Sequence, residues 1–543
     1  MLKLTRASLA RRAGLLATAG VLVLGLAACG GSGSAGSGGS AANTGGGLVT
    51  GATGSVSAGA VVKGGDVDVT SSNGEMVGFD PVTLANIGTG IERAALVMDT
   101  LLYRDDLTGA VEPKLAQSMT STDNKVWVLT LRPGVNFSDG TPLDAQAVIF
   151  NLNRHMAADS KSSAKALLSG IDTMEATGDH EITFTLKEVN GSFPIALTAA
   201  SPASLIGSPK ALADPATFAT NPVGAGAFTL DHWTRDSEMK FVPNPGYWDT
   251  GKPYLNSVTF KPITDTQTIA ASLQSGQAQV ALLNASVWQT FISDPAVKVW
   301  ALVGGGAAII PNGTRPIGDE RVRQAISLAL DPKTTNNVVF HGATLWDGSL
   351  DCIPFASSSP VCTSQGVPAP NVEQAKQLVA DYVAGGGNPA AELTYFQSLT
   401  DQATYIQDQL KNIGLDITLK SVDATTLAAV QASGDYDLFY GSTASSGYPT
   451  VWTRLYSGGT NWGKVTYPEL DDALLAARNG ATLDERNAAW QKVLEINRKL
   501  NVAIFMLPYS AAMGTSSKLH LDTGSYPYQG STMQYFDSAW LEQ

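Results

Sequence analysis

The sequence holds few of the residues that carry covalent chemistry or bind metal ions. Its 543 residues include 5 histidines and 3 cysteines, and the histidines are scattered without HExxH spacing. A GxSxG nucleophile elbow is also missing. We therefore expect no enzymatic activity, no metal site and no cofactor. A Ser/His/Asp set assembled only by folding stays open as a hydrolase alternative.

Positively charged residues are outnumbered by negatively charged ones. Charged residues make up 15% of the chain, and the formal net charge is -13. Phosphate binding needs clustered Lys and Arg, and no basic run stands beyond the extreme N-terminus, so nucleic acid is excluded as a partner. A hydrophobic content of 44% is typical of a globular protein, and this length predicts two to four lobes.

The N-terminus has the layout of an export signal. Lys and Arg at positions 3, 6, 11 and 12 precede an apolar run over 14–26, which is too short and too interrupted by Gly for a comfortable membrane span. The run ends in Leu-Ala-Ala-Cys at 26–29, which resembles a bacterial lipobox. That resemblance implies a signal peptide over 1–28, cleavage before Cys29 and a lipid on its thiol. An ordinary signal peptide with a coincidental cysteine is the alternative.

A segment of low complexity follows Cys29. From 30 to 62 it contains no charged residue, and Gly, Ser, Ala and Thr dominate. Such a composition cannot build a core, so 29–62 is predicted to be a flexible tether that starts at the acylated Cys29. The two remaining cysteines, Cys352 and Cys362, are predicted to form a disulfide in an exported protein, with two free thiols as the alternative.

The stretch from 111 to 156 predicts a strand, two turns and a helix. Trp127, Leu129 and Leu131 alternate with their neighbours, as in a strand with one buried face. Pro and Gly residues at 133–142 then form turns. Asp144 is placed to cap a helix whose apolar residues recur at 148, 152 and 156.

The order of short motifs in this stretch closely resembles a known signature. The pieces are PKLA at 113–116, LRPGVNF at 131–137, DGTP at 139–142 and the helix up to Arg154. They resemble the extracytoplasmic solute-binding proteins of ABC importers, specifically the peptide, opine and nickel-binding family, family 5. We interpret the most recognisable residues, Arg132, Asp139 and Gly140, as parts of the scaffold.

Further motifs extend this resemblance to almost everything after Lys63. NPVGAGAF at 221–228 resembles the family's PVGTGPY segment, with Ala225 and Ala227 as departures, and VRQAI at 322–326 and DYD at 435–437 also match. The resemblance implies an α/β, three-lobed, periplasmic-binding-protein-like fold (type II, large peptide-binding class) with mixed sheets and a ligand cleft between lobes. The expected boundaries are 63–103, 225–310 and 505–543 for lobe I, 104–224 for lobe II and 311–504 for lobe III.

Local signals also place several elements late in the chain. Apolar residues at 322, 325, 326, 329 and 330 predict one face of a helix, and TLDE at 482–485 is a capping box that starts another. The run 503–507 is predicted to be a buried strand that ends at Pro508.

By position in the family pattern, the strand at 435–442 and the segment after it should line the cleft. The candidate ligand-binding residues there are Tyr440, Ser445, Tyr448 and Trp452, and weaker candidates are Met76, Phe79, Trp288 and Gly305 within the glycine run 304–306. The aromatic side chains could instead pack a core, and the glycines could instead form a turn.

The composition of this segment bears on the ligand. In peptide-binding members of the family an acidic residue hereabouts pairs with the α-ammonium group of the ligand. This chain has Ser, Gly, Tyr and Pro there, and no Asp or Glu follows Tyr440 until Glu469. A cationic amine in a dry cleft needs a compensating charge. The sequence therefore favours an uncharged, hydroxyl-rich or anionic ligand over an ordinary peptide with a free N-terminus.

Together these features predict a membrane-anchored, monomeric solute-binding protein. It would capture a peptide-like or other small polar solute between lobes and deliver it to the transmembrane subunits of an ABC permease. It would be held on the outer face of the cytoplasmic membrane, or in the periplasm, by the lipid on Cys29. The alternative is the same fold in a non-transport role, as an extracytoplasmic sensor or an envelope-assembly factor.

Overall fold

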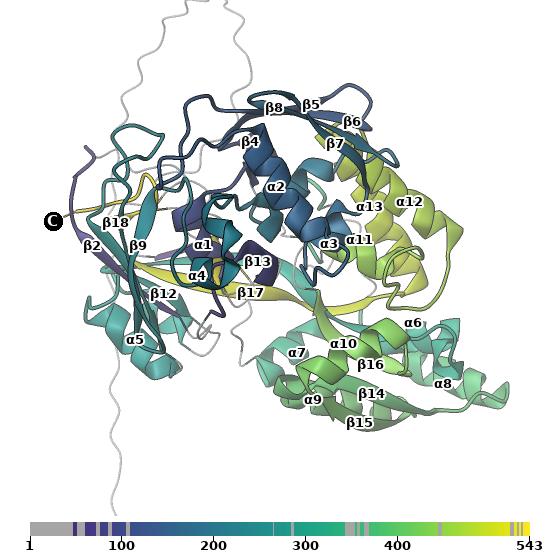
Figure 1. The fold of residues 1–543 in the computed structure, drawn as a ribbon. Helices are drawn as coiled ribbons and strands as arrows, with labels where there is room; N and C mark the ends of the chain where they lie inside the picture. The colour runs from purple at the N-terminus through teal and green to yellow at the C-terminus, as the bar shows by residue number, and fades with distance from the viewer. Residues whose placement is uncertain are drawn as a thin grey trace, which may run out of the picture. The chain divides into compact units, whose positions relative to one another are not determined.

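The computed structural model describes 47–50, 60–71, 76–84, 90–104, 109–263, 265–283, 287–340, 342, 353–355, 359–362, 369–443, 448–521, 526–528, 531–533 and 536–542. The predicted signal peptide, the lipobox with Cys29, and Cys352 lie outside these residues. Figure 1 shows the described chain as helices packed on mixed sheets.

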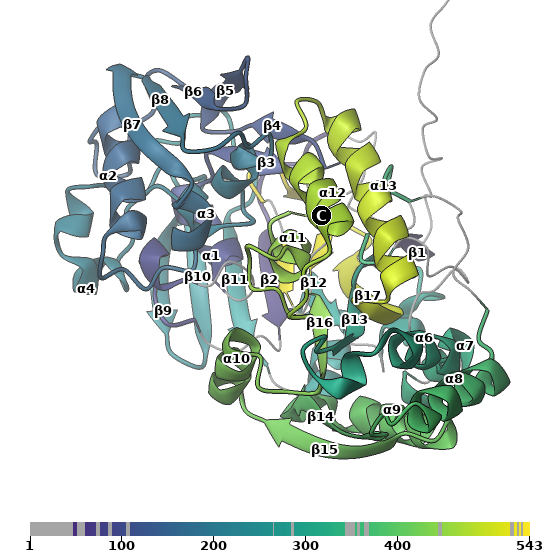
Figure 2. The ribbon, with the colours of Figure 1, turned by 90° about the vertical axis from the view of Figure 1, so that its right-hand side faces the viewer.

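One large mixed sheet carries much of the chain (Figures 1 and 2). Its strands, in spatial order, are β15 (Asp416–Val422), β14 (Ala390–Phe396), β16 (Leu438–Thr443), β13 (Val297–Pro311), β17 (Ile504–Ser516), β12 (Val280–Leu283), β2 (Asp66–Ser71), β11 (Ser257–Pro262), β10 (Glu238–Pro243) and β9 (Phe228–Thr234). It therefore combines strands from the ranges expected for lobe I with strands from the range expected for lobe III.

The two longest strands, β13 and β17, are antiparallel neighbours in the middle of this sheet. Their register shifts between Val303 and Gly306, and Gly306 lies opposite Pro508. The prediction that Pro508 ends the strand is wrong, because β17 continues to Ser516. Proline is tolerated here because the bulge already interrupts the ladder of hydrogen bonds. The glycines at 304–306 belong to β13, so the alternative of a turn is also wrong.

Part of the segment predicted to be a tether belongs to the same sheet. Gly47–Thr50 forms β1, which pairs in parallel with Lys298–Ala301 of β13. Strand pairing uses backbone groups, so a segment without an apolar pattern can occupy a free edge. The composition of 29–62 could not show this.

A separate antiparallel sheet, in the order β5 (Ala116–Ser121), β6 (Val126–Leu131), β8 (Glu181–Leu186) and β7 (Ile171–Gly178), contains the motif region. Helix α2 (Ala145–Met156) packs on β7 and β8, and α3 (Lys165–Leu168) packs on α2 (Figure 1). We call its apolar interior the β6 core, represented by Leu129, Leu152 and Phe184. The alternation predicted for β6 is confirmed, since Trp127, Leu129 and Leu131 are buried.

The motif residues hold turns in place, as expected for a scaffold. Asp144 Oδ1 accepts from the Ala147 amide at 2.8 Å and so caps α2. Asp139 accepts from the Thr141 amide and from Ser208 Oγ, and Gly140 has a φ of +81°. The Arg132 guanidinium lies 4.7 Å from the ring centre of Trp248.

Most of the remaining helices pack on the half of the large sheet that contains β14, β15 and β16. They are α6 (Glu320–Ala329), α7 (Pro332–Val339), α8 (Val372–Ala384), α9 (Thr400–Asn412), α10 (Ala424–Ser433), α11 (Thr450–Leu455), α12 (Pro468–Asn479) and α13 (Leu483–Leu500); α1 (Ile91–Met98), α4 (Pro215–Phe218) and α5 (Thr266–Gln274) lie earlier in the chain. The apolar face predicted for α6 is buried, and the capping box of α13 is present, so both predictions are confirmed.

Helices α11, α12 and α13 enclose a further apolar interior, which we call the α13 core and which includes Trp452, Leu474 and Val493. Among the described residues, none belongs to both the β6 core and the α13 core. The two regions therefore have distinct clusters of buried side chains.

Two polar side chains near the end of α2 are withdrawn from solvent, Arg154 in part and His155 almost completely. The Arg154 guanidinium donates two hydrogen bonds to the Asp80 carboxylate, at 2.9 and 2.8 Å. His155 is 1% exposed, and its Nδ1 lies 2.6 Å from Ser162 Oγ. Burial, reinforced by the Arg154 charge, lowers the pKa of His155 to about 4, although Asp80 opposes the shift.

Neutral His155 predicts a loss of stability in mild acid. The unfolded chain takes up a proton near pH 6.5, whereas the folded protein does so only near pH 4. The stabilisation is complete above pH 6.5 and is lost as the pH falls toward 4, and the loss amounts to roughly 2 kcal/mol at pH 5. Urea unfolding at pH 7 and pH 5 should show that His155→Gln reduces this pH dependence, whereas His180→Gln, in the turn between β7 and β8, does not. Equal pH dependence in both variants would contradict the assignment.

Candidate functional site

The predicted site residues after β16 form an aromatic group on α11 and the residues before it. The rings of Tyr448 and Trp452 meet edge to face with centroids 5.8 Å apart, and Trp452 and Tyr456 lie 4.4 Å apart. Trp452 Nε1 donates to the Leu474 carbonyl at 2.8 Å, which ties α11 to α12. Trp452 is 8% exposed, whereas Tyr448 is only half-buried. Tyr448 is therefore the member that stands at the edge of the α13 core.

Polar groups from two parts of the chain meet this aromatic edge. Asn190 Nδ2, from the loop after β8, donates to the Tyr448 hydroxyl at 3.3 Å. The Arg478 guanidinium, from the end of α12, lies 5.0 Å from the ring centre of Trp452. Burial raises the pKa of Tyr448, while the Asn190 hydrogen bond and the Arg478 charge oppose that shift. The phenol is therefore neutral at physiological pH and is available for hydrogen bonding beside a cation.

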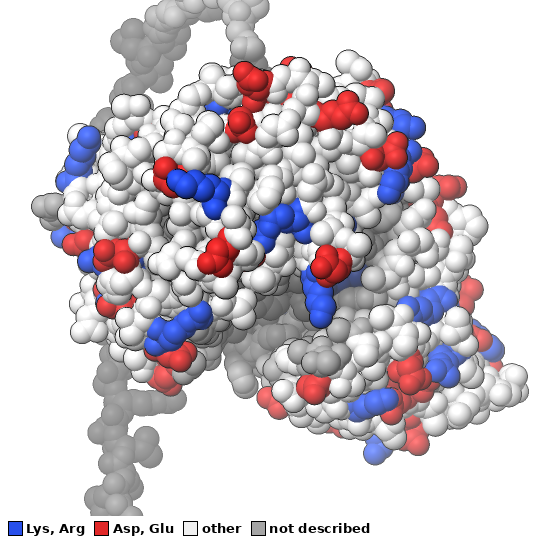
Figure 3. Space-filling view, in the orientation of Figure 1, with Lys and Arg blue, Asp and Glu red and all other residues white. Residues whose placement is uncertain are grey.

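This combination suits reversible binding. An amphipathic aromatic wall with a few oriented polar groups is the usual lining of a site for small molecules. Figure 3 shows a recess in the described surface between the part that carries α3 and the part that carries α10.

The other predicted site residues lie apart from this group. Phe79 is fully buried against Trp233 and Phe241, and Met76 is 2% exposed in the same core. Trp288 is buried in an apolar cluster with residues of α5. Tyr440 is 1% exposed and belongs to the cluster that contains residues of α6 and α9. Gly305 lies within β13, and Ser445 lies outside the described residues. The structure thus brings together Tyr448 and Trp452, and the ligand-binding role of all eight residues stays a prediction.

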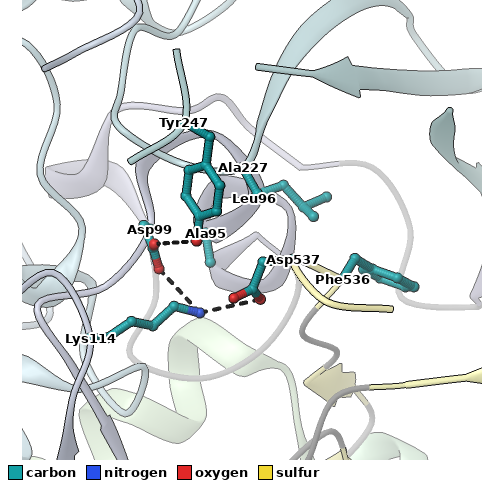
Figure 4. A pocket seen from close by; sticks show the side chains of 8 residues that line it. All are labelled: Ala95, Leu96, Asp99, Lys114, Ala227, Tyr247, Phe536 and Asp537. Atoms are coloured by element: carbon teal, nitrogen blue, oxygen red, sulfur yellow. Dashed lines mark hydrogen bonds and ion pairs between the residues drawn. The ribbon is translucent and has the colours of Figure 1, made fainter. Parts of the chain in front are cut away.

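A small cavity at another place holds a buried group of charges (Figure 4). Lys114 Nζ lies 3.2 Å from Asp99 Oδ1 and 3.5 Å from Asp537 Oδ1. Tyr247 and Trp248 both donate to Asp99 Oδ2 at 3.3 Å. Burial raises the pKa of Asp99, and Lys114 opposes that shift. The group joins four segments that are distant in the sequence.

The sequence does not predict this charged group. Its members stand at 99, 114, 247, 248 and 537, and no local pattern links such positions. The cavity offers about 10 Å³ for the centre of a water molecule, which is room for about one water. We therefore interpret it as a structural ion cluster, too small for a solute.

Two further classes of site find no support in the described part of the chain. No three His, Cys, Asp or Glu side chains described here come together as a metal site. Within the described ranges, no helix has the length and apolar character to cross a membrane. Cys362 lies in the described segment 359–362 and Cys352 does not, so their disulfide stays a prediction.

Comparison with known proteins agrees with the architecture. Residues 110–464 match the family described as "Bacterial extracellular solute-binding proteins, family 5 Middle". The oligopeptide-binding protein AppA from Bacillus subtilis, solved with a nonapeptide, has the same fold with a TM-score of 0.71 at 23% identity, over 89% of this chain and 100% of AppA. The fold is thus that of the large α/β periplasmic binding proteins.

Sequence relatives give the same result. Protein XP55 of Streptomyces lividans is 28% identical over 449 residues, which are 77% of this chain and 80% of XP55. The glutathione-binding protein GsiB of Salmonella paratyphi A is 30% identical over 373 residues, 64% of this chain and 69% of GsiB. The class is therefore a solute-binding protein that serves an ABC transporter. This chain belongs to family 5 of the bacterial extracellular solute-binding proteins.

The buried cluster generates a stability prediction. Lys114→Met leaves Asp99 and Asp537 close together without the cation between them, and removal of one partner from a buried pair is strongly destabilising. We expect a loss of about 2–3 kcal/mol in the free energy of unfolding, since Lys114 is still 15% exposed. The control Lys376→Met breaks a surface pair with Glu373 and should cost under about 1 kcal/mol. Equal losses in denaturant titrations would refute a special role for Lys114.

Proposed function

We propose that the protein captures a small peptide-like or other small polar solute beside Tyr448 and Trp452 and delivers it to an ABC permease. The mature chain acts as a monomer, is anchored by a lipid on Cys29 to the outer face of the cytoplasmic membrane, and carries a Cys352–Cys362 disulfide. Relatives named as oligopeptide-binding and glutathione-binding support the peptide-like class. Binding needs no covalent step, so we propose no enzymatic activity.

The observation that carries this proposal is the sign of the charge at the aromatic edge. The charged group that acts on the Tyr448 hydroxyl is the Arg478 guanidinium, which lies over Trp452. Among the described residues, no carboxylate forms an ion pair with Arg478. A cation in this position favours a carboxylate or a neutral acceptor of the solute and disfavours an ammonium group.

The shared strands support capture by closure. The β13–β17 pair continues through both halves of the large sheet, and its bulge spans Val303–Ala308, where the register shifts twice. A bend at this bulge would bring α11 and α12 toward the other half while each core stays packed. Meanwhile a solute bound between the halves would stabilise the protein by mass action.

The first experiment is native mass spectrometry of the protein purified from producing cells, before and after mild denaturation. A reproducible small molecule released on denaturation would support binding and reveal the class of the solute. If nothing is released, a thermal-shift panel of peptides, sugars and metal chelates follows. A lack of any shift across that panel would favour the non-transport role of the same fold.

The chemistry of the site gives a sharper prediction for short peptides. We expect trialanine and N-acetyl-trialanine to bind equally well, because the proposed contact is with the carboxylate and not with the amine. Arg478→Met should weaken the binding of both by about tenfold or more, since a charged hydrogen bond contributes roughly 1.5–3 kcal/mol. Trialanine amide should bind weakly to the wild type and to the variant alike. Calorimetric titration measures each dissociation constant.

The matched control is Lys499→Met, which removes one positive charge from exposed Lys499 in α13. It should leave the affinity for all three peptides unchanged. A strong preference of the wild type for the free amine would refute the argument from charge.

A further inference from the structure

A short loop, together with Asn124, brings the part of the chain around the β6 core into contact with the part around the α13 core. This loop, 189–192, follows β8 and lies against the turn between α12 and α13. Ser192 donates twice to the Arg478 carbonyl, from its amide at 3.0 Å and from Oγ at 3.1 Å. Asn124 Nδ2 donates to the Asn479 carbonyl at 3.4 Å, and Asn190 reaches Tyr448 as described above.

The accepting groups lie at the end of a helix. Arg478 and Asn479 are the last two residues of α12, and the final carbonyls of an α-helix have no acceptor role within the helix. Ser192 and Asn124 thus cap α12 from a separately packed part of the chain. When the two parts separate, water can satisfy the same carbonyls, so the contact can open without leaving buried groups unpaired.

Gly191 permits this close approach. A Cβ at position 191 would lie 2.2 Å from the Gly480 carbonyl oxygen and 3.2 Å from the Asn479 oxygen. Both obstacles are backbone atoms, which cannot move aside as the end of a flexible side chain can. A side chain at this position is therefore incompatible with the contact as it stands.

The contact has the character of a reversible interface. It consists of hydrogen bonds to backbone carbonyls and a glycine, and the cores on its two sides share no residue of the described chain. Small polar interfaces between separately packed units allow relative motion, whereas large apolar ones do not.

We propose that loop 189–192 is a latch that docks on the α12–α13 turn and positions Tyr448 through Asn190. The latch joins the two cores whether or not a solute is bound, and it releases when they separate. This inference extends the proposed function, because Tyr448 is also the proposed contact for the solute. Asn190, Gly191 and Ser192 act as positioning residues, whatever solute the protein carries.

The test is hydrogen exchange of the solute-free, full-length protein, so the latch and the proposed solute chemistry can fail independently. In Gly191→Ala, the amide of Ser192 should exchange at least tenfold faster than in the wild type, and amides of the α12–α13 turn should also speed up. Amides of β6 should be unchanged, because the β6 core does not depend on the latch.

Gly170→Ala is the matched control. It is the same substitution in the same part of the chain, and a Cβ there meets no atom within 4 Å. Its exchange should equal that of the wild type. If Gly191→Ala fails to fold, Ser192→Ala removes only the Oγ donor and should speed up exchange on the α12–α13 turn by about threefold to tenfold.

Two results would overturn the proposal. Identical Ser192 exchange in Gly191→Ala and the wild type would mean that the loop and the turn are not in contact in solution. Faster exchange in the variant that spreads to all of β6 would mean that the contact is an integral part of the β6 core and not a latch.

Discussion

The backbone ladder between β13 and β17 is the constraint on which the rest of the structure depends. These two strands pair from Val297 to Ile309 and are the only connection by which the sheet around β2 continues into the sheet around β14, as far as the described residues show. The ladder is interrupted where Gly306 faces Pro508, and a Cβ on Gly306 would lie 2.4 Å from Ile353 Cγ2. A shared sheet whose register shifts twice within Val303–Ala308 holds the two halves together while it concentrates bending in that short segment.

The two halves that this ladder joins each have a hydrophobic core, and much of the packing in these cores could be predicted from the sequence. The alternation in β6, the Asp144 cap and the face of α6 are local patterns, and all appear as expected because periodicity reports which side of an element is buried. Pro508 misled the prediction for the opposite reason. Whether a proline ends a strand depends on whether its partner strand already has a bulge, and that is a property of Gly306, which stands some 200 positions away.

The candidate site was only partly predictable, for a similar reason. Tyr448 and Trp452 follow a recognisable strand, and their order along α11 brings them together. Asn190 and Arg478, by contrast, belong to other elements and reach the same edge only through tertiary packing. Their side chains decide the polarity of the edge, and the missing acidic residue alone does not reveal the positive charge that Arg478 brings to it. The Asp99–Lys114–Asp537 cluster is the extreme case, since its members share no local pattern at all.

The ion cluster and the loop at 189–192 differ in how easily the segments that they join can separate. The ion cluster around Lys114 is largely buried, and separating its members would leave Asp99 without its cation, so the cluster fixes the segments that it joins. The loop at 189–192 instead offers its hydrogen bonds to carbonyls that water can reach once the loop withdraws. Charge burial and helix capping thus have different roles. The first holds together the segments around Lys114, and the second lets the halves meet and part, as capture and later release of a solute require.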